Sequence, residues 1–393
     1  MIRTNYYQDL TKMNTFGMKV KARCFMEYDS VADLVDIEFE ELARPVLHIG
    51  GGSNLLFTDD FKGTVLHSKI NFIEILDECQ CIPEAPSHSV GPSPYPGVGK
   101  CLLHTNGTSS DDVDSTDAGT KDASDSVMVS VGAGVVFDDF CDWAAKEGLW
   151  GVENLSHIPG EVGASAVQNI GAYGVEVKDV IRKVYCYDTQ EEEFVHFDVE
   201  ECGYGYRDSI FKDPDIKGRY IVTHVVFSLS REPMPKLDYG HLKDAVDAAA
   251  ESASHPADPA LIRKVIIKIR KEKLPEPSVM GSAGSFFKNP VISMEHFQRI
   301  EAVAKAEHGP DYKVPHYDLP DGMVKVPAAW MIEQCGWKGR RSGNAAVYDK
   351  QPLVIVNYTG DAYPEEIISL ERRIIASVKA KFDVELHPEV DHI

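Results

Sequence analysis

Residues 151–174 read GVENLSHIPGEVGASAVQNIGAYG, the longest glycine-rich stretch considered in this chain. It holds five glycines and no charged residue between Glu161 and Glu176. A solvent-exposed loop would be more polar, and a core helix would contain fewer glycines. The stretch therefore predicts backbone that packs closely around a large, flat, partly polar ligand.

A second glycine-rich stretch precedes it, at residues 45–57, PVLHIGGGSNLLF. It predicts a short buried strand, a glycine loop and a further apolar run. Backbone N–H groups in such a loop can bind a pyrophosphate. Three consecutive glycines alone are weak evidence, and the spacing is not that of a Rossmann G-x-G-x-x-G motif followed by a helix. We interpret His48 as a strand residue rather than a ligand.

A candidate reactive hydroxyl lies in residues 281–290, GSAGSFFKNP. Ser285 follows Gly284 and precedes two phenylalanines, which can exclude water around it. A shielded hydroxyl suits a proton donor or a nucleophile. A Gly/Ser turn that enters a buried strand explains the same residues, and this stretch alone does not decide between the two interpretations.

Cations flank these glycine-rich stretches. Arg207 lies among aromatic residues, which suits bidentate binding of a carboxylate or phosphate, although an ion pair with Asp208 is an equally good interpretation. Residues 261–273 predict an amphipathic helix whose basic face includes Arg263. Because this helix leads directly into the Ser285 loop, cations at its C-terminal end could meet a diphosphate.

Composition limits the class of protein. The chain has 393 residues, 43% hydrophobic and 26% charged, which predicts two or three ordinary globular domains. A formal net charge of -22 repels nucleic acid and anionic membranes, so we expect neither as a partner. We also expect a cytoplasmic protein, because no stretch has the apolar core of a signal peptide or the length of a membrane span. The close pair Cys79 and Cys81 lacks further ligands at zinc spacing, so we expect no metal.

Residues 77–126 carry nine acidic and two basic residues among many Ser, Pro, Gly and Thr. We interpret them as a flexible surface insert within a hairpin. Elsewhere periodicity and capping signals predict helices over 30–44, 137–147, 261–273, 296–308, 328–335 and 364–382. Strands are predicted over 127–134, 182–188, 220–229, 345–348 and 353–358.

Taken together, these stretches resemble the bacterial UDP-N-acetylenolpyruvoylglucosamine reductases, also called UDP-N-acetylmuramate dehydrogenases, of peptidoglycan synthesis. Eight segments carry the resemblance in the family's order and spacing: NTFG (14–17), GGGSNLLF (50–57), IPGEVGASAVQNIGAYG (158–174), YRDSIFK (206–212), KLPEP (273–277), GSFFKNP (284–290), AAWMIEQCGWKG (328–339) and LHPEV (386–390). Two features depart from the family. Ser282 stands where many members have Asn, and the 77–126 insert is not a family feature.

The resemblance implies an α+β fold. Its parts would be two subdomains of an FAD-binding fold of the vanillyl-alcohol-oxidase/p-cresol-methylhydroxylase type and a C-terminal α+β substrate-binding domain. We expect the first subdomain at 1–68, the second at 69–231, a linker with a tyrosine loop at 232–260, and the substrate domain at 261–393. A loop like that of Tyr239 marks the longer of the family's subtypes.

The resemblance also implies the site residues. The catalytic positions match Arg207, Ser285 and Glu389. Non-covalent FAD would be held by Gly50, Gly51, Gly52, Ser53, Asn54, Leu55, Ile158, Pro159, Gly160, Gly163, Ala164, Gln168, Asn169, Gly171, Ala172, Tyr173 and Gly174. The substrate would contact Tyr173, Tyr206, Arg207, Tyr239, Arg270, Lys273, Ser285, Asn289 and Glu389.

The family's reaction implies a role for each catalytic residue. NADPH reduces FAD, the enolpyruvyl ether of UDP-N-acetylglucosamine receives hydride from flavin N5, and the product is UDP-N-acetylmuramate. Arg207 and Glu389 would stabilise charge on the substrate carboxylate, and Ser285 would donate the proton. We expect burial to raise the pKa of Glu389 so that it can donate a hydrogen bond. The enzyme would act as a monomer.

Two other functions are considered. One is a flavin oxidase of the same superfold, and the other is a non-catalytic nucleotide-binding protein. The segments 273–277 and 284–290 together with Glu389 argue against the oxidase, and the intact set of Arg207, Ser285 and Glu389 argues against the binding protein. Anaerobic bleaching of the yellow protein by NADPH, followed by re-oxidation only by the UDP-sugar, would identify the reductase.

Overall fold

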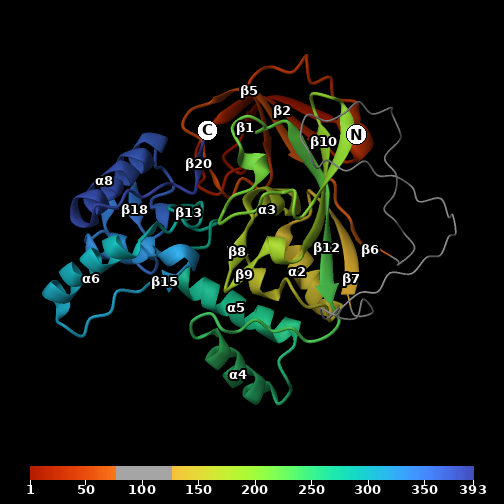
Figure 1. Cartoon of the computed structure of the whole chain (residues 1–393). Helices are drawn as coiled ribbons and strands as arrows, with labels where there is room; N and C mark the ends of the chain where they lie inside the picture. Colours follow the sequence, from red (N-terminus) through yellow and green to blue (C-terminus); the bar gives the residue numbers. More distant parts are fainter. Residues whose placement is uncertain (77–125) are drawn as a thin grey trace. The chain divides into compact units, whose positions relative to one another are not determined.

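The computed structural model describes residues 1–76 and 126–393 (Figure 1). Contacts group these residues into two compact units, the first formed by 1–2, 27–41 and 67–267 and the second by 3–26, 42–66 and 268–393. Both units mix helices and strands, as the predicted α+β class requires. The predicted insert and Cys79 and Cys81 lie outside the described residues, except that Ser126 begins a strand. The predicted domain boundaries after residues 68, 231 and 260 stay a prediction.

The first unit contains a five-stranded antiparallel sheet with strand order β11-β10-β12-β7-β6 (Figure 1). Its strands are β11 (Glu193–Asp198), β10 (Ile181–Asp188), β12 (Tyr220–Ser230), β7 (Ser126–Gly132) and β6 (Ile73–Ile75). Valines lie opposite one another across its centre, with Val184 and Val131 both paired to Val225. β-Branched side chains suit such a buried surface, and the strands predicted over 182–188 and 220–229 are confirmed.

Helix α3 (Val162–Gln168) packs on β12 and β7, and α2 (Phe137–Lys146) contacts the same sheet at β12. The Phe140 ring of α2 lies 4.7 Å from the Phe227 ring of β12. The remaining short elements of the unit are α1 (Val31–Val35), η2 (Glu153–Leu155), β8 (Gly171–Ala172), β9 (Val175–Glu176), η3 (Val177–Asp179), η4 (Ile210–Lys212) and α4 (Leu242–Ala253). Helix α5 (Pro259–Lys273) begins in this unit and runs into residue 268 of the second.

Two helix predictions differ from the structure. The helix expected over 30–44 ends at Val35, because only Leu34 of α1 is buried and Val35 is 46% exposed, so no continuous apolar face stabilises a longer helix. Ser30 does cap it, since its hydroxyl accepts the Asp33 N–H. The second difference is α3, which was not predicted. Glycines are frequent around this helix, although Gly163 is the one glycine within it, and they obscured the helical pattern.

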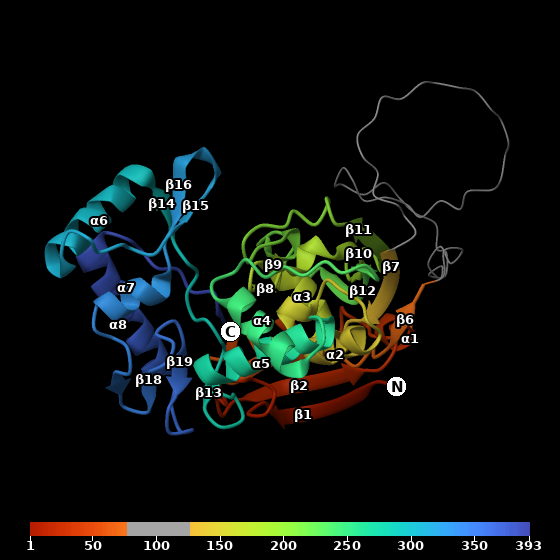
Figure 2. The same ribbon diagram turned by 90° about the horizontal axis from the view of Figure 1, so that it is seen from below.

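The second unit holds two four-stranded sheets and one of three strands (Figure 2). The first has the order β1-β2-β5-β3, with β1 (Arg3–Asp9), β2 (Lys21–Tyr28), β5 (Phe61–Ser68) and β3 (Val46–Ile49). The second has the order β13-β19-β18-β17, with β13 (Gly281–Ser282), β19 (Ile355–Asn357), β18 (Ala345–Val347) and β17 (Arg341–Ser342). The third has the order β14-β16-β15, with β14 (Val291–Ser293), β16 (Met323–Lys325) and β15 (Tyr317–Asp318). A short helix, η5 (Pro320–Gly322), connects β15 to β16.

Three helices complete this unit, α6 (Met294–His308), α7 (Ala328–Gln334) and α8 (Pro364–Phe382). Helix α8 has the predicted bounds, with Pro364 at its start and a capping box between Tyr363 and Glu366. It packs on β18 and β19 through a buried apolar stripe, Ile367, Leu370, Ile374, Val378 and Phe382. Among the described residues no helix is long and apolar enough to cross a membrane.

Candidate active site

Three predicted segments meet in the second unit although they are far apart in sequence. The Glu389 N–H donates to the Phe286 carbonyl at 2.8 Å, and the Lys288 N–H donates to the His387 carbonyl at 2.9 Å. The Asn54 amide in turn donates to the Glu389 carbonyl at 3.0 Å. The glycine loop, the Ser285 loop and residues 386–390 therefore form one hydrogen-bonded cluster.

The Ser285 loop is shaped by two glycines for different reasons. At Gly281 an added Cβ would lie 2.2 Å from the Phe16 carbonyl oxygen, so this glycine permits a close backbone approach. At Gly284 there is open space, but φ is +69°, a conformation that favours glycine. The rings of Phe286 and Phe287 are buried in the core, while Ser285 is half-buried. The glycines thus serve the protein's own backbone here, and the core leaves the Ser285 hydroxyl near its margin.

The glycine loop follows β3, which contains His48 as predicted. Gly52 has φ +61°, and a Cβ there would lie 1.9 Å from the Met13 carbonyl oxygen, so only glycine fits beside the 14–17 segment. Within the described part of the chain, the N–H groups of Gly50, Gly51 and Gly52 donate to no other residue. Consecutive unengaged N–H groups suit the pyrophosphate of a dinucleotide. The loop continues through Ser53 and Asn54 into β4 (Leu55–Leu56), which pairs in parallel with β20 (Asp391–His392).

Other predicted substrate residues of the second unit lie at a helix end or bind one. The Asn289 side chain accepts the Ala328 N–H at 2.9 Å and so caps α7, which has no side-chain cap of its own at Pro327. Arg270 is half-buried and Lys273 is exposed, and both lie in the last turn of α5. Cations there suit the helix dipole whether or not they bind a ligand.

In the first unit the predicted flavin segment is built around α3. Ile158, Pro159 and Gly160 lead into the helix, and Gly163 packs so closely on Ala133 that a Cβ would lie 2.9 Å from the Ala133 Cβ. Ala164 and Gln168 are half-buried on the same helix. Asn169 ends it in a left-handed conformation, φ 45°, fully buried, and its amide donates to the Gly205 carbonyl at 2.7 Å. The chain then turns through Gly171, Ala172, Tyr173 and Gly174.

Arg207 is fixed against this turn. Its guanidinium donates to the Gly171 carbonyl at 2.6 Å and to the Asn169 carbonyl at 3.3 Å, and its Cζ lies 5.2 Å from the centre of the Tyr206 ring. Lys212 binds the Arg207 carbonyl at 3.2 Å and the Gln168 side chain at 2.9 Å. The structure therefore brings Tyr206 and Arg207 together with the predicted flavin residues 168–174.

Tyr239 lies beside the same turn. Its ring makes an edge contact with Tyr173, with centroids 5.9 Å apart, and it is 45% exposed. Tyr173 itself has φ +49°, in the left-handed region. Two of the three tyrosines predicted to contact substrate, Tyr173 and Tyr239, are thus neighbours in the first unit.

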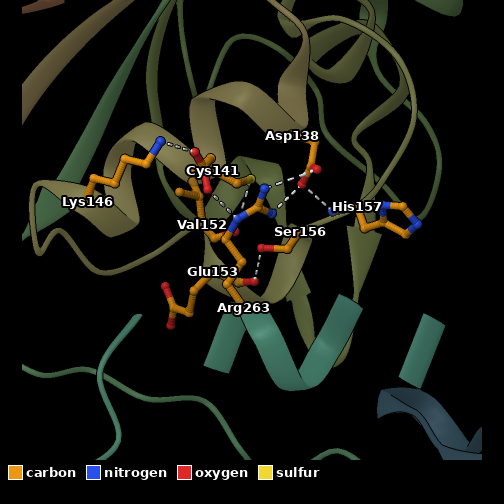
Figure 3. A network of polar contacts seen from close by, with 9 residues as sticks. Asp138, Cys141, Lys146, Val152, Glu153, Ser156, His157 and Arg263 are labelled. Carbon is orange, nitrogen blue, oxygen red and sulfur yellow. Dashed lines mark hydrogen bonds and ion pairs between the residues drawn. The ribbon is translucent and has the colours of Figure 1, made fainter. Parts of the chain in front are cut away.

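A polar network that the sequence did not reveal joins Asp138, His157 and Arg263 (Figure 3). The Arg263 guanidinium of α5 makes a bidentate ion pair with Asp138 of α2, and its Nε lies 3.2 Å from Asp142. The same Asp138 carboxylate accepts the backbone N–H of His157, which has φ +61°. Arg263 was predicted to lie on a solvated basic face, but its side chain is 11% exposed. It joins two helices to the start of the flavin segment.

The pKa of Asp138 indicates that its carboxyl is charged in this network. Burial alone would raise the pKa of Asp138, but hydrogen bonds from Arg263 and the His157 N–H outweigh burial and hold that pKa below its ordinary value. Burial also raises the pKa of the neighbouring Glu153 carboxyl, although the Gly151 N–H donates to it at 2.7 Å. Asp138 is therefore a charged anchor.

A second unpredicted network holds Glu161, the residue before α3. The His67 imidazole is 2% exposed, and its Nε2 lies 2.9 Å from Glu161 Oε1 while its Nδ1 lies 3.1 Å from Glu27 Oε1. Glu27, His67 and Glu161 are distant in sequence, so no local pattern could reveal this contact. The predicted flavin segment is thus held at the His157 N–H by the half-buried Asp138 carboxylate and at Glu161 by the buried His67 imidazole.

Comparisons with known proteins identify the family of the chain. The family described as UDP-N-acetylenolpyruvoylglucosamine reductase, C-terminal domain, matches residues 276–393, and the FAD binding domain family matches residues 112–197. The UDP-N-acetylenolpyruvoylglucosamine reductase of Bacteroides fragilis strain YCH46 is 46% identical over 387 residues, 98% of each chain. That of Porphyromonas gingivalis strain ATCC 33277 is 39% identical over 395 residues, 100% of this chain and 99% of the relative.

A solved structure supports the fold. The UDP-N-acetylenolpyruvylglucosamine reductase of Thermus caldophilus aligns over 100% of this chain and 98% of its own, with a TM-score of 0.58 and 21% identity. The predicted FAD-binding fold and the predicted family are both confirmed. The chain belongs to the UDP-N-acetylenolpyruvoylglucosamine reductase family.

Proposed function

We propose which residues of this chain perform the steps of its reaction. As a member of its family, the protein is an FAD-dependent, NADPH-driven oxidoreductase of peptidoglycan precursor synthesis, and hence of cell wall biogenesis. Its substrate in this proposal is the enolpyruvyl ether of UDP-N-acetylglucosamine, and its product is UDP-N-acetylmuramate. One observation carries the assignment in the second unit, the hydrogen bonding of Glu389 both to the Ser285 loop and to the glycine loop.

FAD, once bound and reduced by NADPH, supplies the hydride that adds to the substrate double bond. The unengaged N–H groups of 50–52 would hold its pyrophosphate, together with Ser53, Asn54 and Leu55. In the first unit the close-packed segments would line the flavin, with Ile158, Pro159, Gly160, Gly163, Ala164, Gln168, Asn169, Gly171, Ala172, Tyr173 and Gly174 as its contacts. Asp138 and His67 support the two ends of 157–161 and keep this surface in place.

Ser285 donates the proton that completes the reduction. Its half-buried hydroxyl lies at the margin of the Phe286 and Phe287 core, where a neutral donor can reach a substrate carbon while the rings keep out water. Main-chain bonds to residues 387 and 389 fix the segment that carries it. A proton donor must be positioned within hydrogen-bond reach, and a fixed loop meets that need.

Arg207 and Glu389 stabilise the charge that develops on the substrate carboxylate. The two carbonyls that hold the Arg207 guanidinium fix its orientation before substrate binds, which is the preorganisation that electrostatic catalysis requires. Glu389 would act in its protonated form, since only the protonated carboxyl can donate a hydrogen bond to another carboxylate. The further substrate contacts in this proposal are Tyr173, Tyr206, Tyr239, Arg270, Lys273 and Asn289.

The proposal extends to organisation. We assign FAD binding to residues 1–68 and 69–231, the tyrosine loop to 232–260, and substrate binding to 261–393. A cytoplasmic location and a monomeric state complete it, since a soluble nucleotide-sugar substrate requires neither a membrane nor a second subunit.

The substitution Ser285→Ala tests the proposal by separating the two half-reactions. Ser285 has no role while NADPH reduces FAD, so anaerobic bleaching should proceed at nearly the wild-type rate. Re-oxidation by the enolpyruvyl substrate should slow by about 10² to 10⁴, the usual effect of removing a general acid. Stopped-flow absorbance of the flavin measures each step separately. Ser285→Cys should retain part of the second step, because a thiol can donate a proton from nearly the same place.

Ser293→Ala is the matched structural control. Ser293 caps α6 by accepting the His296 N–H at 3.2 Å, so its loss should cost about 1 kcal/mol of stability and leave both half-reactions unchanged. If re-oxidation of the Ser285→Ala variant stays fast, Ser285 is not the proton donor. If both half-reactions of that variant slow equally, the residue acts only in the structure of its loop.

A further inference from the structure

A carboxylate lies buried on the apolar face of α8. Glu371 shares that face with Ile367 and Ile374, which are fully buried. A buried carboxylate is costly unless it is paired, and replacing a buried polar pair by apolar residues often leaves stability unchanged or raises it. The presence of Glu371 at this position therefore calls for a reason other than the stability of α8.

The partner of Glu371 is the last histidine of the chain. The His392 Nε2 atom lies 3.0 Å from Glu371 Oε2, and the two side chains are 31% and 9% exposed. The His392 ring also packs edge-on against the Phe286 ring, with centroids 6.1 Å apart and planes at 68°. One imidazole thus contacts both α8 and the residue next to Ser285.

This contact differs in kind from the main-chain contacts of residues 386–393, which we call the C-terminal segment. The N–H groups of Glu389 and Asp391 join the segment to two loops. Leu386 and Val390 are buried in the core, but the burial of apolar side chains is not directional. The His392 side chain adds a directional bond to a helix of 19 residues with a buried apolar stripe.

We propose that Glu371 and His392 are positioning residues for the step in which the substrate re-oxidises the flavin. Their bond fixes the C-terminal segment and the Ser285 loop against α8, and so holds Glu389 and Ser285 at a constant separation. This inference rests on the proposed function, because it takes Ser285 and Glu389 to act on the substrate. NADPH reduction of the flavin needs neither residue and should proceed at nearly the wild-type rate.

The substitution His392→Phe removes the bond and keeps an aromatic ring beside Phe286. Small displacements of catalytic groups are costly, so stopped-flow absorbance of the holoenzyme should show re-oxidation by the enolpyruvyl substrate about ten- to hundredfold slower. His392→Gln keeps an N–H donor that can reach Glu371, so it should retain most of the wild-type rate. Wild-type re-oxidation in His392→Phe would overturn the inference, and so would an equal loss in His392→Gln.

His296→Phe is the matched control. The His296 Nε2 atom lies 2.8 Å from the Phe382 carbonyl oxygen, so this substitution removes a similar bond to the C-terminal end of the same helix. Both half-reactions should keep their wild-type rates. If re-oxidation slows as much as in His392→Phe, the effect comes from the stability of α8 and the inference is wrong.

A double variant removes the dependence on folding. Glu371→Leu combined with His392→Phe leaves no unpaired buried charge, so the protein should fold as stably as wild type. Its re-oxidation should be as slow as that of His392→Phe alone, because both changes remove the same bond. Recovery of the wild-type rate would show that the pair serves stability alone.

Amide hydrogen exchange of the holoenzyme provides a readout other than rate. The Glu389 N–H, which binds the Phe286 carbonyl, should exchange at least about tenfold faster in His392→Phe and in the double variant than in wild type. Unchanged exchange would contradict the inference. Ser285→Ala, measured alongside, separates the two claims, since fast re-oxidation in that variant would remove the proposed function as well.

Discussion

The substitution Asp138→Asn tests the network of Asp138, Arg263 and His157, which precedes the predicted flavin residues 158–160. It keeps the shape of the side chain and an acceptor for the His157 N–H, but it removes the charge that pairs with Arg263. The Arg263 side chain is 11% exposed, so its charge cannot be fully solvated where it lies. Asp142 remains 3.2 Å from Arg263 Nε, but its side chain is 43% exposed and also pairs with Lys146.

The expected magnitude follows from this burial. Removing one partner of a buried ion pair costs about 3 to 5 kcal/mol, because the other charge is left unpaired. The Asp138 side chain is 25% exposed, so water compensates in part, and we expect a loss of about 2 to 3 kcal/mol in the free energy of unfolding. Urea unfolding of the FAD-free protein, followed by circular dichroism, measures it.

Asp142→Asn is the matched control, one turn further along α2. It removes a more exposed partner of the same arginine, so it should cost less than about 1 kcal/mol. Equal losses in the two variants, or a loss below about 1 kcal/mol for Asp138→Asn, would refute the argument that Asp138 is the anchor of this network.

The effect should depend on pH with a defined sign. The pKa of Asp138 is held below its ordinary value, so the charged form is favoured in the folded state. Its stabilising contribution is therefore fully present above the unfolded pKa, about 3.9, and is lost as pH falls through the folded pKa. The stability difference between wild type and Asp138→Asn should be constant from about pH 5 to 7 and should shrink below about pH 4.

Two further predictions concern the second unit and its substrate. Gly52→Ala should lower stability and FAD retention more than Gly17→Ala. Both glycines have positive φ, so each substitution costs about 1 to 2 kcal/mol in backbone strain. Only at Gly52 would the new Cβ also lie 1.9 Å from a backbone oxygen. Equal urea midpoints and equal flavin content would contradict this. Lys273→Ala should weaken substrate binding by about 1.5 to 3 kcal/mol, measured as the substrate Kd, and should leave NADPH reduction of the flavin nearly unchanged. Lys271→Ala, two residues away on the same exposed helix end, is its control, and equal damage to both half-reactions of Lys273→Ala would remove the assignment.

Elements whose apolar residues follow one period were predictable. For α2 the predicted face, Phe137, Phe140, Cys141 and Ala144, is the buried face, because a helix of ten residues presents enough periodic positions to define it. The same holds for α8. Short elements at the flavin segment were not predictable in this way. Helix α3 has seven residues, and its stability comes from close packing of Gly163 on Ala133, which only tertiary structure supplies.

The supporting residues of the site were hidden for a similar reason. Asp138 and Asp142, one turn apart on α2, signalled a partner of positive charge, but nothing local identified Arg263 among six cations of α5. Arg263 lies at the edge of that helix's apolar stripe, next to buried Ile262, and this position was the available signal.

Residues 386–393 show how main-chain pairing alone can determine a site. A carboxylate between Pro388 and Val390 reads as a surface residue in the sequence, yet the chain around Glu389 is fixed on both sides. The Asp391 N–H donates to the Asn54 carbonyl at 3.0 Å and the Ile393 N–H to the Leu56 carbonyl at 2.9 Å, while the Glu389 N–H binds Phe286. These bonds use backbone groups that every sequence has, so no residue pattern could predict them. The same short segment pairs with the glycine loop and with the Ser285 loop. A displacement of the glycine loop must therefore also displace Glu389. The proposed acid and the proposed pyrophosphate site are thus expected to move together.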